Sequence, residues 1–323
     1  MKSYARVGLA AVATAGMLLA VVGCQPYDDG YDSASPSPWK TSASAPVTPV
    51  SSTSGYVAMG DSYTAGPGIP DQTGGPAGCA RSDRNYPSLV AQQLALQPAG
   101  FRDLSCTGAT IADLTSPQTT NDGVNPAQLS ALSTSTKLVT IGVGGNDVGF
   151  ESVIKQCAKV GIFFYTTGDT DYSGDYAPCR QQYVSGGSDE IRTKIQTAGE
   201  RLAGALSEVK RRAPHARVYV VGYPAVLPAK GSNCGRAIGL VPGDVAFLYQ
   251  EQRTLNTTLR QRAEAAGVGY VDTYTPSVGR DACAASATRW VEPWIPHSPA
   301  APLHPNERGE RGMADAVLHA ING

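Results

Sequence analysis

The chain has 323 residues, of which 41% are hydrophobic and 16% charged, with a formal net charge of −1. This length allows one large domain or two small ones, and the hydrophobic share is enough for a proper core. The charges are balanced and form no long run of one sign, so nothing in the composition supports a nucleic-acid partner.

Residues 1–23 are predicted to be a signal peptide rather than part of the fold. Lys2 and Arg6 supply positive charge, and residues 7–22 are a nearly unbroken run of small apolar residues, which is typical of a secretory signal. The run ends in VVGC, which resembles a lipobox, so we expect Cys24 to receive diacylglyceryl. An ordinary signal peptide with an incidental cysteine and a short membrane anchor are the alternatives.

Residues 24–53 are predicted to be a linker, because they are rich in Ser, Pro, Thr and Ala and lack the apolar periodicity needed to pack. If Cys24 carries lipid, the linker is a tether with a reach on the order of 30 Å. We expect residues 54–323 to form the folded domain. The sequence thus predicts an exported protein held by lipid on the extracellular face of the cell membrane.

The cysteine count favours disulfides. Seven cysteines are present, and six remain when Cys24 is set aside, which suits three disulfides in an exported chain. Six cysteines allow 15 pairings, and we choose sequential pairing because each bond then closes a local loop. The expected pairs are Cys79–Cys106, Cys157–Cys179 and Cys234–Cys283. A zinc site is the alternative, but no C-x-x-C spacing supports it.

Short strands alternate with helices from residue 54 onward. The apolar patterns predict strands at residues 56–59, 137–143, 217–223 and 269–271. They predict helices at residues 86–97, 147–156, 189–212, 244–266 and 308–321. Such alternation is typical of a parallel sheet with helices on both faces, so the sequence predicts a three-layer α/β/α fold.

Two polar segments that contain glycine follow predicted strands. They are Gly60-Asp61-Ser62 and the GGND segment at residues 144–147. Gly, Asp and Ser favour turns for backbone reasons alone. However, ligand sites in parallel α/β folds lie beyond the carboxyl ends of the strands. Two such corners on one edge of a sheet therefore indicate a functional site.

Ser62 is the candidate nucleophile, because Gly60 allows a sharp bend before it and its own backbone N–H could face an oxyanion. Common motifs do not fit. An α/β-hydrolase elbow requires Gly where Thr64 stands. The segment GVGGND has Asp147 at the third glycine position of a dinucleotide fingerprint, and no P-loop sequence is present.

A histidine is needed as the base, and the chain has four. His215 follows a proline in a predicted surface turn, and His319 lies on the last predicted helix. His297 lies in a proline-rich loop. His304, in PLHPNERG, is flanked by prolines that stiffen the loop just before the last helix. His304 is therefore the candidate base.

Four short segments, in this order, resemble the SGNH or GDSL hydrolases. GDSY carries Ser62, CTGAT carries Gly108, GGND carries Asn146 and HPN carries His304. The resemblance covers most of residues 54–322 and is closest to the secreted, three-disulfide actinobacterial lipases and esterases. It implies a flavodoxin-like α/β/α fold around a parallel sheet.

The resemblance implies an ester hydrolase that uses a dyad of Ser62 and His304 and an acyl-enzyme intermediate. The implied oxyanion donors are the N–H groups of Ser62 and Gly108 and the side-chain amide of Asn146. An acyl ester is the implied substrate, no metal or organic cofactor is implied, and a monomer is the default. The alternative is a catalytically silent lipoprotein that binds lipid or acylated wall glycan.

One position departs from the family pattern. Many members carry Asp three residues before the histidine, where this chain has Ala301. Some members of the secreted branch use a main-chain carbonyl instead, so we expect the Ala301 carbonyl to accept a hydrogen bond from the His304 ring. Asp281, Glu292 or Glu307 could orient the ring if the loops had unusual geometry.

Structural roles are favoured for three further features. Asp61 is too close to Ser62 to be a third triad member, so we expect it to hold the loop by accepting backbone hydrogen bonds. Residues 169–175 begin like a calcium loop, but Arg180 stands where a bidentate Glu is required. Several aromatic residues fall in predicted loops and either line an acyl groove or fill loop cores: Phe163, Phe164, Tyr165, Trp290 and Trp294.

Overall fold

The computed structural model describes residues 55–167, 176–229, 234 and 238–323. The predicted signal peptide, Cys24, the linker and the calcium-like segment 169–175 lie outside the described residues. In the part of the chain that the structure describes, no helix is long and apolar enough to cross a membrane.

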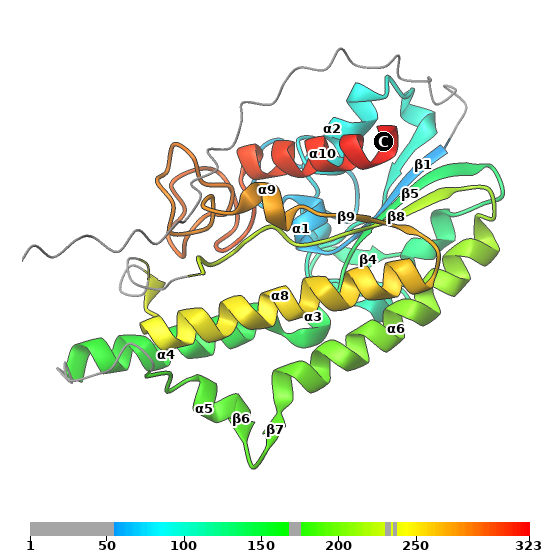
Figure 1. Cartoon of the computed structure of the whole chain (residues 1–323). Coiled ribbons are helices and arrows are strands. Elements are labelled where there is room, and N and C mark those ends of the chain that lie inside the picture. The colour runs from blue at the N-terminus through cyan, green and yellow to red at the C-terminus, as the bar shows by residue number, and fades with distance from the viewer. Residues whose placement is uncertain (1–54, 168–175, 230–233, 235–237) are drawn as a thin grey trace, which may run out of the picture. The chain divides into compact units, whose positions relative to one another are not determined.

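A central sheet of five parallel strands confirms the predicted fold (Figure 1). The strand order is β2-β1-β5-β8-β9. The strands are β1 (Gly55–Gly60), β2 (Phe101–Asp103), β5 (Thr136–Gly142), β8 (Arg217–Val221) and β9 (Gly269–Val271). β1, β5 and β8 occupy the inner positions, and β1 and β5 are mostly buried on both faces, as expected of strands covered by helices on both sides.

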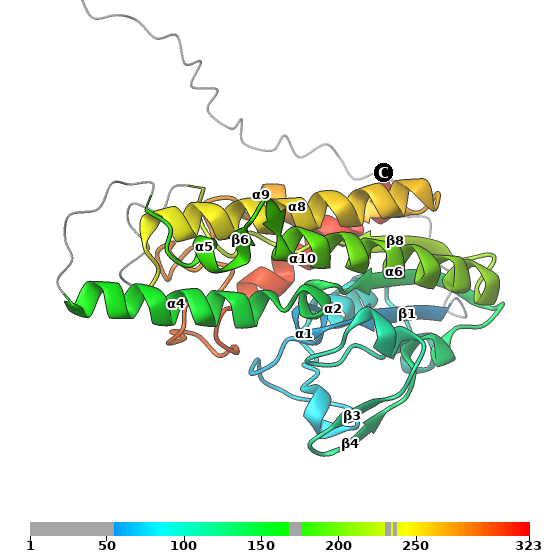
Figure 2. The same ribbon diagram turned by 90° about the horizontal axis from the view of Figure 1, so that it is seen from below.

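Helices cover both faces of the sheet (Figures 1 and 2). The helices α2 (Tyr86–Gln93) and α10 (Glu307–Asn322) pack against one face. The opposite face is covered by α3 (Gly145–Val148), α6 (Glu190–Arg212) and α8 (Pro242–Ala265). Figure 2 shows α6 and α8 running alongside each other.

Alternate residues of β1 face the two helical layers. Tyr56 and Ala58 belong to the buried cluster with α2 and α10, whereas Val57 and Met59 belong to the cluster with α6 and α8. This is the period-two alternation of a β-strand. β1 ends at the carboxyl edge of the sheet, and Ser62 follows it there.

The α6 helix shows how the sequence sets an element. The Asp189 side chain caps it by accepting the N–H of Arg192, and three basic residues stand in its last turn. Ile191, Ile195 and Leu202 belong to its fully buried stripe, and burying each such side chain contributes about 1.5–3 kcal/mol. The predicted bounds, 189–212, agree with the structure.

The predicted helix at residues 147–156 is wrong, because the structure has two helices there. The short α3 ends at Gly149, whose φ of 71° is left-handed, and α4 (Phe150–Thr167) follows in a new direction. The α4 helix also runs further than predicted, because Cys157 and Phe164 continue its buried side. The predicted helix at residues 86–97 ends early, at Gln93.

Several short elements escaped the sequence analysis, because two to four residues are too few for a periodic pattern. They include edge strand β2 and the hairpins β3 (Gln118–Thr120) with β4 (Gly123–Asn125) and β6 (Val184–Ser185) with β7 (Ser188–Asp189). The short helices are α1 (Ser62–Ala65), α5 (Arg180–Tyr183) and α9 (Tyr274–Ser277). Single 3₁₀ turns cover Ala77–Cys79, Pro98–Gly100, Ile111–Leu114 and Gln128–Ala131.

The cysteines pair in the order that the sequence analysis expects. The bonds are Cys79–Cys106, Cys157–Cys179 and Cys234–Cys283. The first of them matters for the site, because Cys106 opens the CTGAT segment. The Cys106 N–H also donates to the Gly60 carbonyl, at 3.0 Å, so this segment lies against the end of β1.

Candidate active site

Ser62 is the first residue of α1, at the corner where β1 ends. The corner is tight, since a Cβ on Gly60 would lie 2.5 Å from the Gly142 carbonyl oxygen of the neighbouring strand. Asp61 caps α1 by accepting the Tyr63 N–H at 2.9 Å. Gly60, Asp61 and Ser62 thus supply a bend, a helix cap and the candidate nucleophile in three consecutive residues.

His304 meets Ser62 from the other end of the chain. Its Nε2 lies 2.8 Å from the Ser62 Oγ, and its Nδ1 lies 2.7 Å from the carbonyl oxygen of Pro302. Both side chains are buried, each at 6% exposure. Because a carbonyl can only accept, Nδ1 carries the ring hydrogen, and Nε2 is left as the acceptor for the Ser62 hydroxyl.

The expectation that Ala301 orients the ring is wrong, because Pro302 supplies the carbonyl. The Ala301 carbonyl accepts the backbone N–H of His304 instead, at 3.2 Å. The physical reason lies at Leu303, whose φ of 59° is left-handed and turns the Pro302 carbonyl back toward the ring. A ring oriented by the carbonyl two residues earlier needs no carboxylate.

The three carboxylates that were open alternatives bind other groups. The Asp281 carboxylate accepts the Cys283 N–H at 2.9 Å. Glu292 accepts the His297 N–H at 2.8 Å and the Asn306 side chain at 2.6 Å. Glu307 forms exposed ion pairs with arginines. None of these three acids is the hydrogen-bond partner of the His304 ring, whose nitrogens lie against the Pro302 carbonyl and the Ser62 hydroxyl.

The strained Leu303 is held on both sides. The Tyr63 hydroxyl donates to the Leu303 carbonyl at 2.5 Å, and the Leu303 N–H donates to the Glu292 carbonyl at 3.0 Å. The Glu292 N–H returns a bond to the His304 carbonyl, also at 3.0 Å. The ring centroids of Tyr63 and His304 lie 4.9 Å apart. Left-handed non-glycine residues persist only when their surroundings fix them, as here.

Burial lowers the pKa of His304 from its ordinary value near 6.5. The hydrogen bond to the Pro302 carbonyl acts in the opposite direction, because it favours the charged ring, and so does the nearby Glu151. Burial is the larger cause, so the ring is neutral at neutral pH. A neutral ring is the form that can accept the Ser62 proton.

The three expected oxyanion donors lie on adjoining loops. Within the described residues, the backbone N–H groups of Ser62 and Gly108 have no hydrogen-bond partner. The Asn146 amide donates one hydrogen to the Ala109 carbonyl, at 2.9 Å, which leaves its second hydrogen for another acceptor. Asn146 lines the same pocket as Ser62 and His304, whereas Gly108 does not line this pocket in the described part of the chain.

Two side chains of the GGND segment join it to the CTGAT segment and to Ile111, the residue that follows it. One is Asn146, through Ala109, and the other is Asp147, which accepts the Ile111 N–H at 2.9 Å. The exposed Arg201 lies 3.4 Å from the other Asp147 oxygen. The two segments therefore hold each other in place, and Asp147 has a structural role at this junction.

Asp61 has a second partner that the sequence analysis missed. Its Oδ2 accepts the hydroxyl of Tyr223 at 2.5 Å, in addition to the Tyr63 N–H. Burial raises the pKa of Asp61 to about 7, and the two hydrogen bonds limit that rise. Tyr223 is the last residue of the segment RVYVVGY and lies just beyond β8, as Ser62 lies just beyond β1. A polar side chain just beyond a strand's carboxyl end was the available signal.

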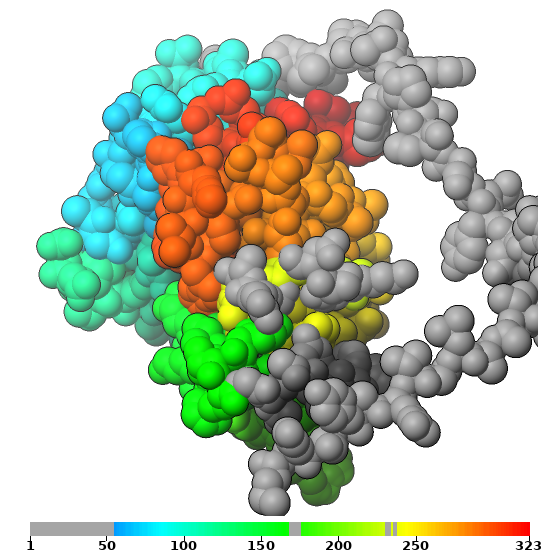
Figure 3. All heavy atoms as spheres, turned by 90° about the vertical axis from the view of Figure 1, so that its left-hand side faces the viewer, coloured from blue at the N-terminus to red at the C-terminus, as the bar shows by residue number. Residues whose placement is uncertain are grey.

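An apolar wall borders the Ser62 pocket. Its apolar lining residues include Phe150, Ile154, Val226, Leu255 and Leu303. Further along α4 lies a second, open groove of about 810 Å³. Its lining includes Lys155, Lys159, Ile162, Ile238, Trp294 and Ile295. Figure 3 shows this region, where the green atoms of α4 lie near the orange atoms of the loop that carries Trp294.

The expectation that five aromatic residues lie in loops is wrong for Phe163, Phe164 and Tyr165, which lie on α4, whereas Trp290 and Trp294 do lie in the loop before α10. Trp294 lines the groove while its indole N–H donates to the Ile238 carbonyl at 2.9 Å. Phe163 is 69% exposed. Phe164 is buried, and Trp290 is buried against α10, where a Cβ on Gly312 would clash with its ring. Only part of the aromatic set thus borders the groove, and Trp290 fills a loop core.

Among the described residues, no group of three or more His, Cys, Asp or Glu side chains is placed to hold a metal ion. The arrangement at Ser62 contains instead a hydroxyl, a neutral imidazole acceptor and unpaired N–H groups. These are the parts that an acyl-transfer site needs, namely a nucleophile, a base and donors for an oxyanion.

Sequence comparisons agree with this chemistry. A model described as the GDSL-like Lipase/Acylhydrolase family matches residues 58–311. Lipase 2 of Streptomyces coelicolor is 38% identical over 285 residues, which cover 87% of this chain and 91% of that protein. An esterase of Streptomyces scabiei is 28% identical over 317 residues, covering 88% of this chain and 90% of that protein.

Structural comparisons lead to the same group. A phospholipase A1 from Streptomyces albidoflavus superposes with a TM-score of 0.65 and 27% identity, over 83% of this chain and 99% of that chain. An extracellular lipase from Streptomyces rimosus gives a TM-score of 0.66 and 25% identity over the same shares. The chain therefore belongs to the GDSL-like lipase/acylhydrolase family, and it is a carboxylic ester hydrolase.

Proposed function

We propose that Ser62 and His304 are the catalytic dyad of this lipase or esterase and that the reaction passes through an acyl-enzyme on Ser62. The observation that carries the proposal is the chain of contacts from the Ser62 Oγ through the His304 ring to the Pro302 carbonyl. A serine hydroxyl is a weak nucleophile at neutral pH, and an adjacent neutral imidazole activates it.

The proposed steps use the dyad and the three expected oxyanion donors. His304 Nε2 removes the hydroxyl proton as the Ser62 Oγ attacks the ester carbonyl carbon. The N–H groups of Ser62 and Gly108 and the free amide hydrogen of Asn146 stabilise the oxyanion. The imidazolium then protonates the leaving alcohol, and water repeats the sequence on the acyl-enzyme. The Pro302 carbonyl holds the ring tautomer but stabilises the imidazolium less than a carboxylate would.

The test is hydrolysis of a short-chain nitrophenyl ester by wild type and by Ser62→Ala. We expect the variant to lose turnover while keeping its melting temperature, because Ser62 Oγ has His304 as its side-chain partner and little packing depends on it. Undiminished turnover in a folded Ser62→Ala would overturn the proposal. The alternative of a silent lipid- or glycan-binding protein is not favoured by the relatives, which are named lipases and esterases.

For the substrate, we propose an ester whose acyl chain contacts the apolar wall of the Ser62 pocket. The far end of a long acyl chain extends along α4 into the open groove. The apolar lining of both regions supports this, as do relatives named lipase, esterase and phospholipase A1. Glycerides, phospholipids and acylated wall polysaccharides all remain candidates.

A panel of esters from acetyl to long acyl, with a glyceride, a phospholipid and an acylated polysaccharide included, distinguishes these substrates. Ile162→Asn in the groove should raise KM for long esters and leave acetyl esters unchanged. The matched control is Val278→Asn, since Val278 is similarly exposed but lines a hollow formed by other residues. Equal effects of both variants on long esters would contradict the proposed path.

We propose that residues 54–323 form the hydrolase domain, that the protein is exported, and that Cys24 carries a lipid anchor. The disulfides and the extracellular Streptomyces lipase among the relatives support export. Labelling of the full chain with radioactive palmitate in its host should tag wild type but not Cys24→Ala. We propose a monomer, to be tested by analytical ultracentrifugation.

A further inference from the structure

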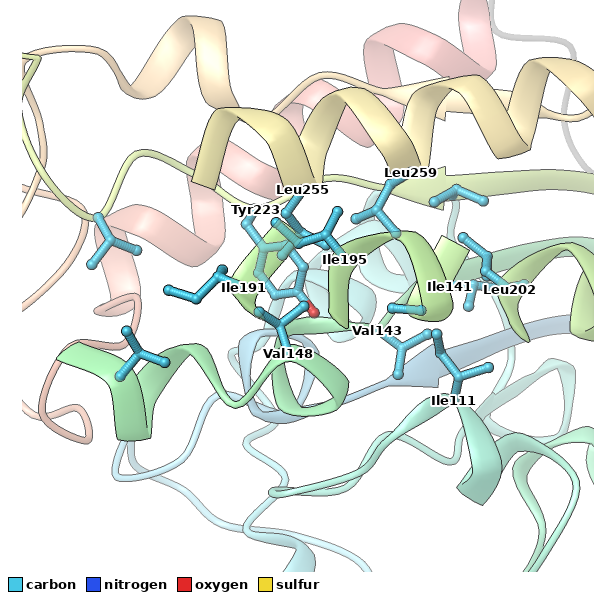
Figure 4. Close-up of a cluster of buried hydrophobic side chains, with 14 of the residues drawn as sticks. Ile111, Ile141, Val143, Val148, Ile191, Ile195, Leu202, Tyr223, Leu255 and Leu259 are labelled. Carbon is cyan, nitrogen blue, oxygen red and sulfur yellow. The ribbon is translucent and has the colours of Figure 1, made fainter. Parts of the chain in front are cut away.

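Tyr223 is a buried polar residue that takes no part in the proposed dyad. It lies two residues after β8, and its side chain is only 5% exposed. Its ring belongs to the same buried cluster as Val148, Ile195 and Leu255, as Figure 4 shows. A phenylalanine would fill this apolar space equally well, so the hydroxyl needs a separate explanation.

The hydroxyl joins two loops. It donates to Oδ2 of Asp61 at 2.5 Å and accepts the N–H of Gly145 at 2.8 Å. The directions are unambiguous, because an N–H only donates and the phenol has a single hydrogen to give. The approach is close, since a Cβ on Gly145 would lie 3.2 Å from this oxygen. Glycine at position 145 is therefore part of the same contact.

Each joined residue directly precedes a proposed oxyanion donor. Asp61 precedes Ser62, whose N–H is free, and Gly145 precedes Asn146, whose amide keeps one free hydrogen. The hydroxyl of Tyr223 therefore bonds to the residue just before each donor. The last backbone bond between the two loops is the Asp61 N–H to the Gly142 carbonyl, at 2.9 Å, three residues before Gly145, and the Tyr223 hydroxyl supplies a further link beyond it.

Tyr223 is itself held from the helical layer. Its backbone N–H donates to Oδ1 of Asn256 at 2.8 Å, and its carbonyl accepts Nδ2 of the same side chain at 2.9 Å. Asn256 lies on α8 and is buried. These two bonds place the backbone of Tyr223 against a long, rigid helix. A position defined in this way suits a residue that orients others.

We propose that Tyr223 is a positioning residue that sets the distance between the Ser62 N–H and the Asn146 amide, and so shapes the oxyanion hole. The inference rests on the proposed dyad and oxyanion donors. Donors that stabilise charge in the transition state must be pre-organised, and small displacements reduce their effect. Removing the hydroxyl would leave the Gly145 N–H and one Asp61 oxygen without their partner.

The experiment is Tyr223→Phe in the full, oxidised enzyme, with a short-chain nitrophenyl ester. We expect kcat to fall roughly 10- to 100-fold and KM to change little, because the loss falls on the transition state. The inhibition constant of an alkyl boronic acid, which forms a tetrahedral adduct on the serine, should rise by a similar factor. If Tyr223 served packing alone, Tyr223→Phe would have a lower melting temperature but would not show a reduced kcat at an unchanged KM.

Tyr56→Phe is the matched control. Tyr56 is also fully buried on the sheet, and its hydroxyl bonds the Thr140 hydroxyl at 2.9 Å, away from the pocket. It should lose comparable stability but keep kcat and boronate affinity. Equal kinetic effects of the two variants, or an unchanged kcat in Tyr223→Phe, would overturn the proposal.

A double-mutant cycle with Asp61→Ala tests the link itself. If the two residues act through one link, their effects on kcat should not add. Full additivity would show independent roles and overturn the proposal. A failure of the proposed function can be told apart from a failure of this inference. If Ser62→Ala were active, or if the wild type did not bind the boronate, the proposed dyad would be contradicted whatever Tyr223→Phe does.

Discussion

The Oγ of Ser62 lies 2.8 Å from Nε2 of His304, although 242 positions separate the two residues. The sheet order explains the meeting. Ser62 follows β1, which lies inside the sheet, and His304 ends the loop that leads into α10, which packs on the face of that sheet. Long-range packing, rather than local sequence, therefore assembles the proposed nucleophile and base.

His304→Ala tests the base. We expect kcat for a short-chain ester to fall roughly 10²- to 10⁴-fold, the usual contribution of general acid–base catalysis. His297→Ala is the control, because His297 borders the groove rather than the Ser62 pocket, and it should leave this activity unchanged. Steady-state kinetics measure both, and equal activity of the two variants would contradict the assignment.

The pH profile tests the protonation state of the ring. The pKa of His304 is lowered by burial, so kcat/KM should rise with pH through an inflection below 6.5 and then level off. The sign follows from the mechanism, because only the neutral ring accepts the serine proton. Glu151 of α4 raises the pKa of the ring and Lys155 lowers it, and both are smaller causes than burial.

Asp61 should add a second inflection near pH 7, where burial has moved its pKa. Its ionised form is the acceptor for the Tyr223 hydroxyl, so activity should rise as Asp61 loses its proton. In Asp61→Asn this second inflection should disappear while the lower one remains. If the lower inflection disappeared instead, the assignment of the two groups would be reversed.

Asn146→Ala tests the side-chain oxyanion donor. Removal of one such donor typically costs roughly 10²- to 10³-fold in kcat, and we expect a loss of this size with little change in KM. Thermal unfolding is the companion measurement, because the lost bond to the Ala109 carbonyl also affects the loop. A kcat within about threefold of wild type would be incompatible with the role, given that magnitude.

The Cys79–Cys106 bond should matter for turnover as well as stability. It closes a loop with a sequence separation of 27 and ends two residues before Gly108. Loop-closure entropy predicts a loss of about 3–4 kcal/mol for Cys79→Ser/Cys106→Ser. The control is Cys157→Ser/Cys179→Ser. It removes a bond that closes a loop of similar length at α4, with a sequence separation of 22.

We expect both double variants to melt at lower temperature, since the two loops are similar in length. The Cys79–Cys106 variant should also lose kcat, because Gly108 would no longer be held beside β1. Denaturant unfolding and ester kinetics measure the two effects. Equal kinetics of the two variants would argue against a link between this disulfide and the oxyanion donors.

The sequence predicted the regular part of the fold, where long apolar patterns are present. The stripe of α6 and the inner strands β1 and β5 are examples. It did not predict the break at Gly149, because a single left-handed residue leaves the apolar pattern almost unchanged. The edge strand β2 was missed, since three half-exposed residues give no periodic signal.

For the site, the sequence predicted that Gly108 would lie together with Ser62, Asn146 and His304. In the described part of the chain the last three line one pocket, and Gly108 does not line it. The sequence analysis named the wrong carbonyl, because the left-handed conformation of Leu303 comes from tertiary contacts with Tyr63 and Glu292. A leucine gives no local indication of that conformation. Such context-dependent backbone geometry is invisible in a single sequence.

Covalent labelling of the folded, oxidised enzyme by an organophosphonate, followed by mass spectrometry of the peptides, tests the central proposal most directly. We expect one phosphonyl group per chain, on Ser62, with no labelling in Ser62→Ala and very slow labelling in His304→Ala. Labelling of a different residue, or an active enzyme that takes up no label, would contradict it.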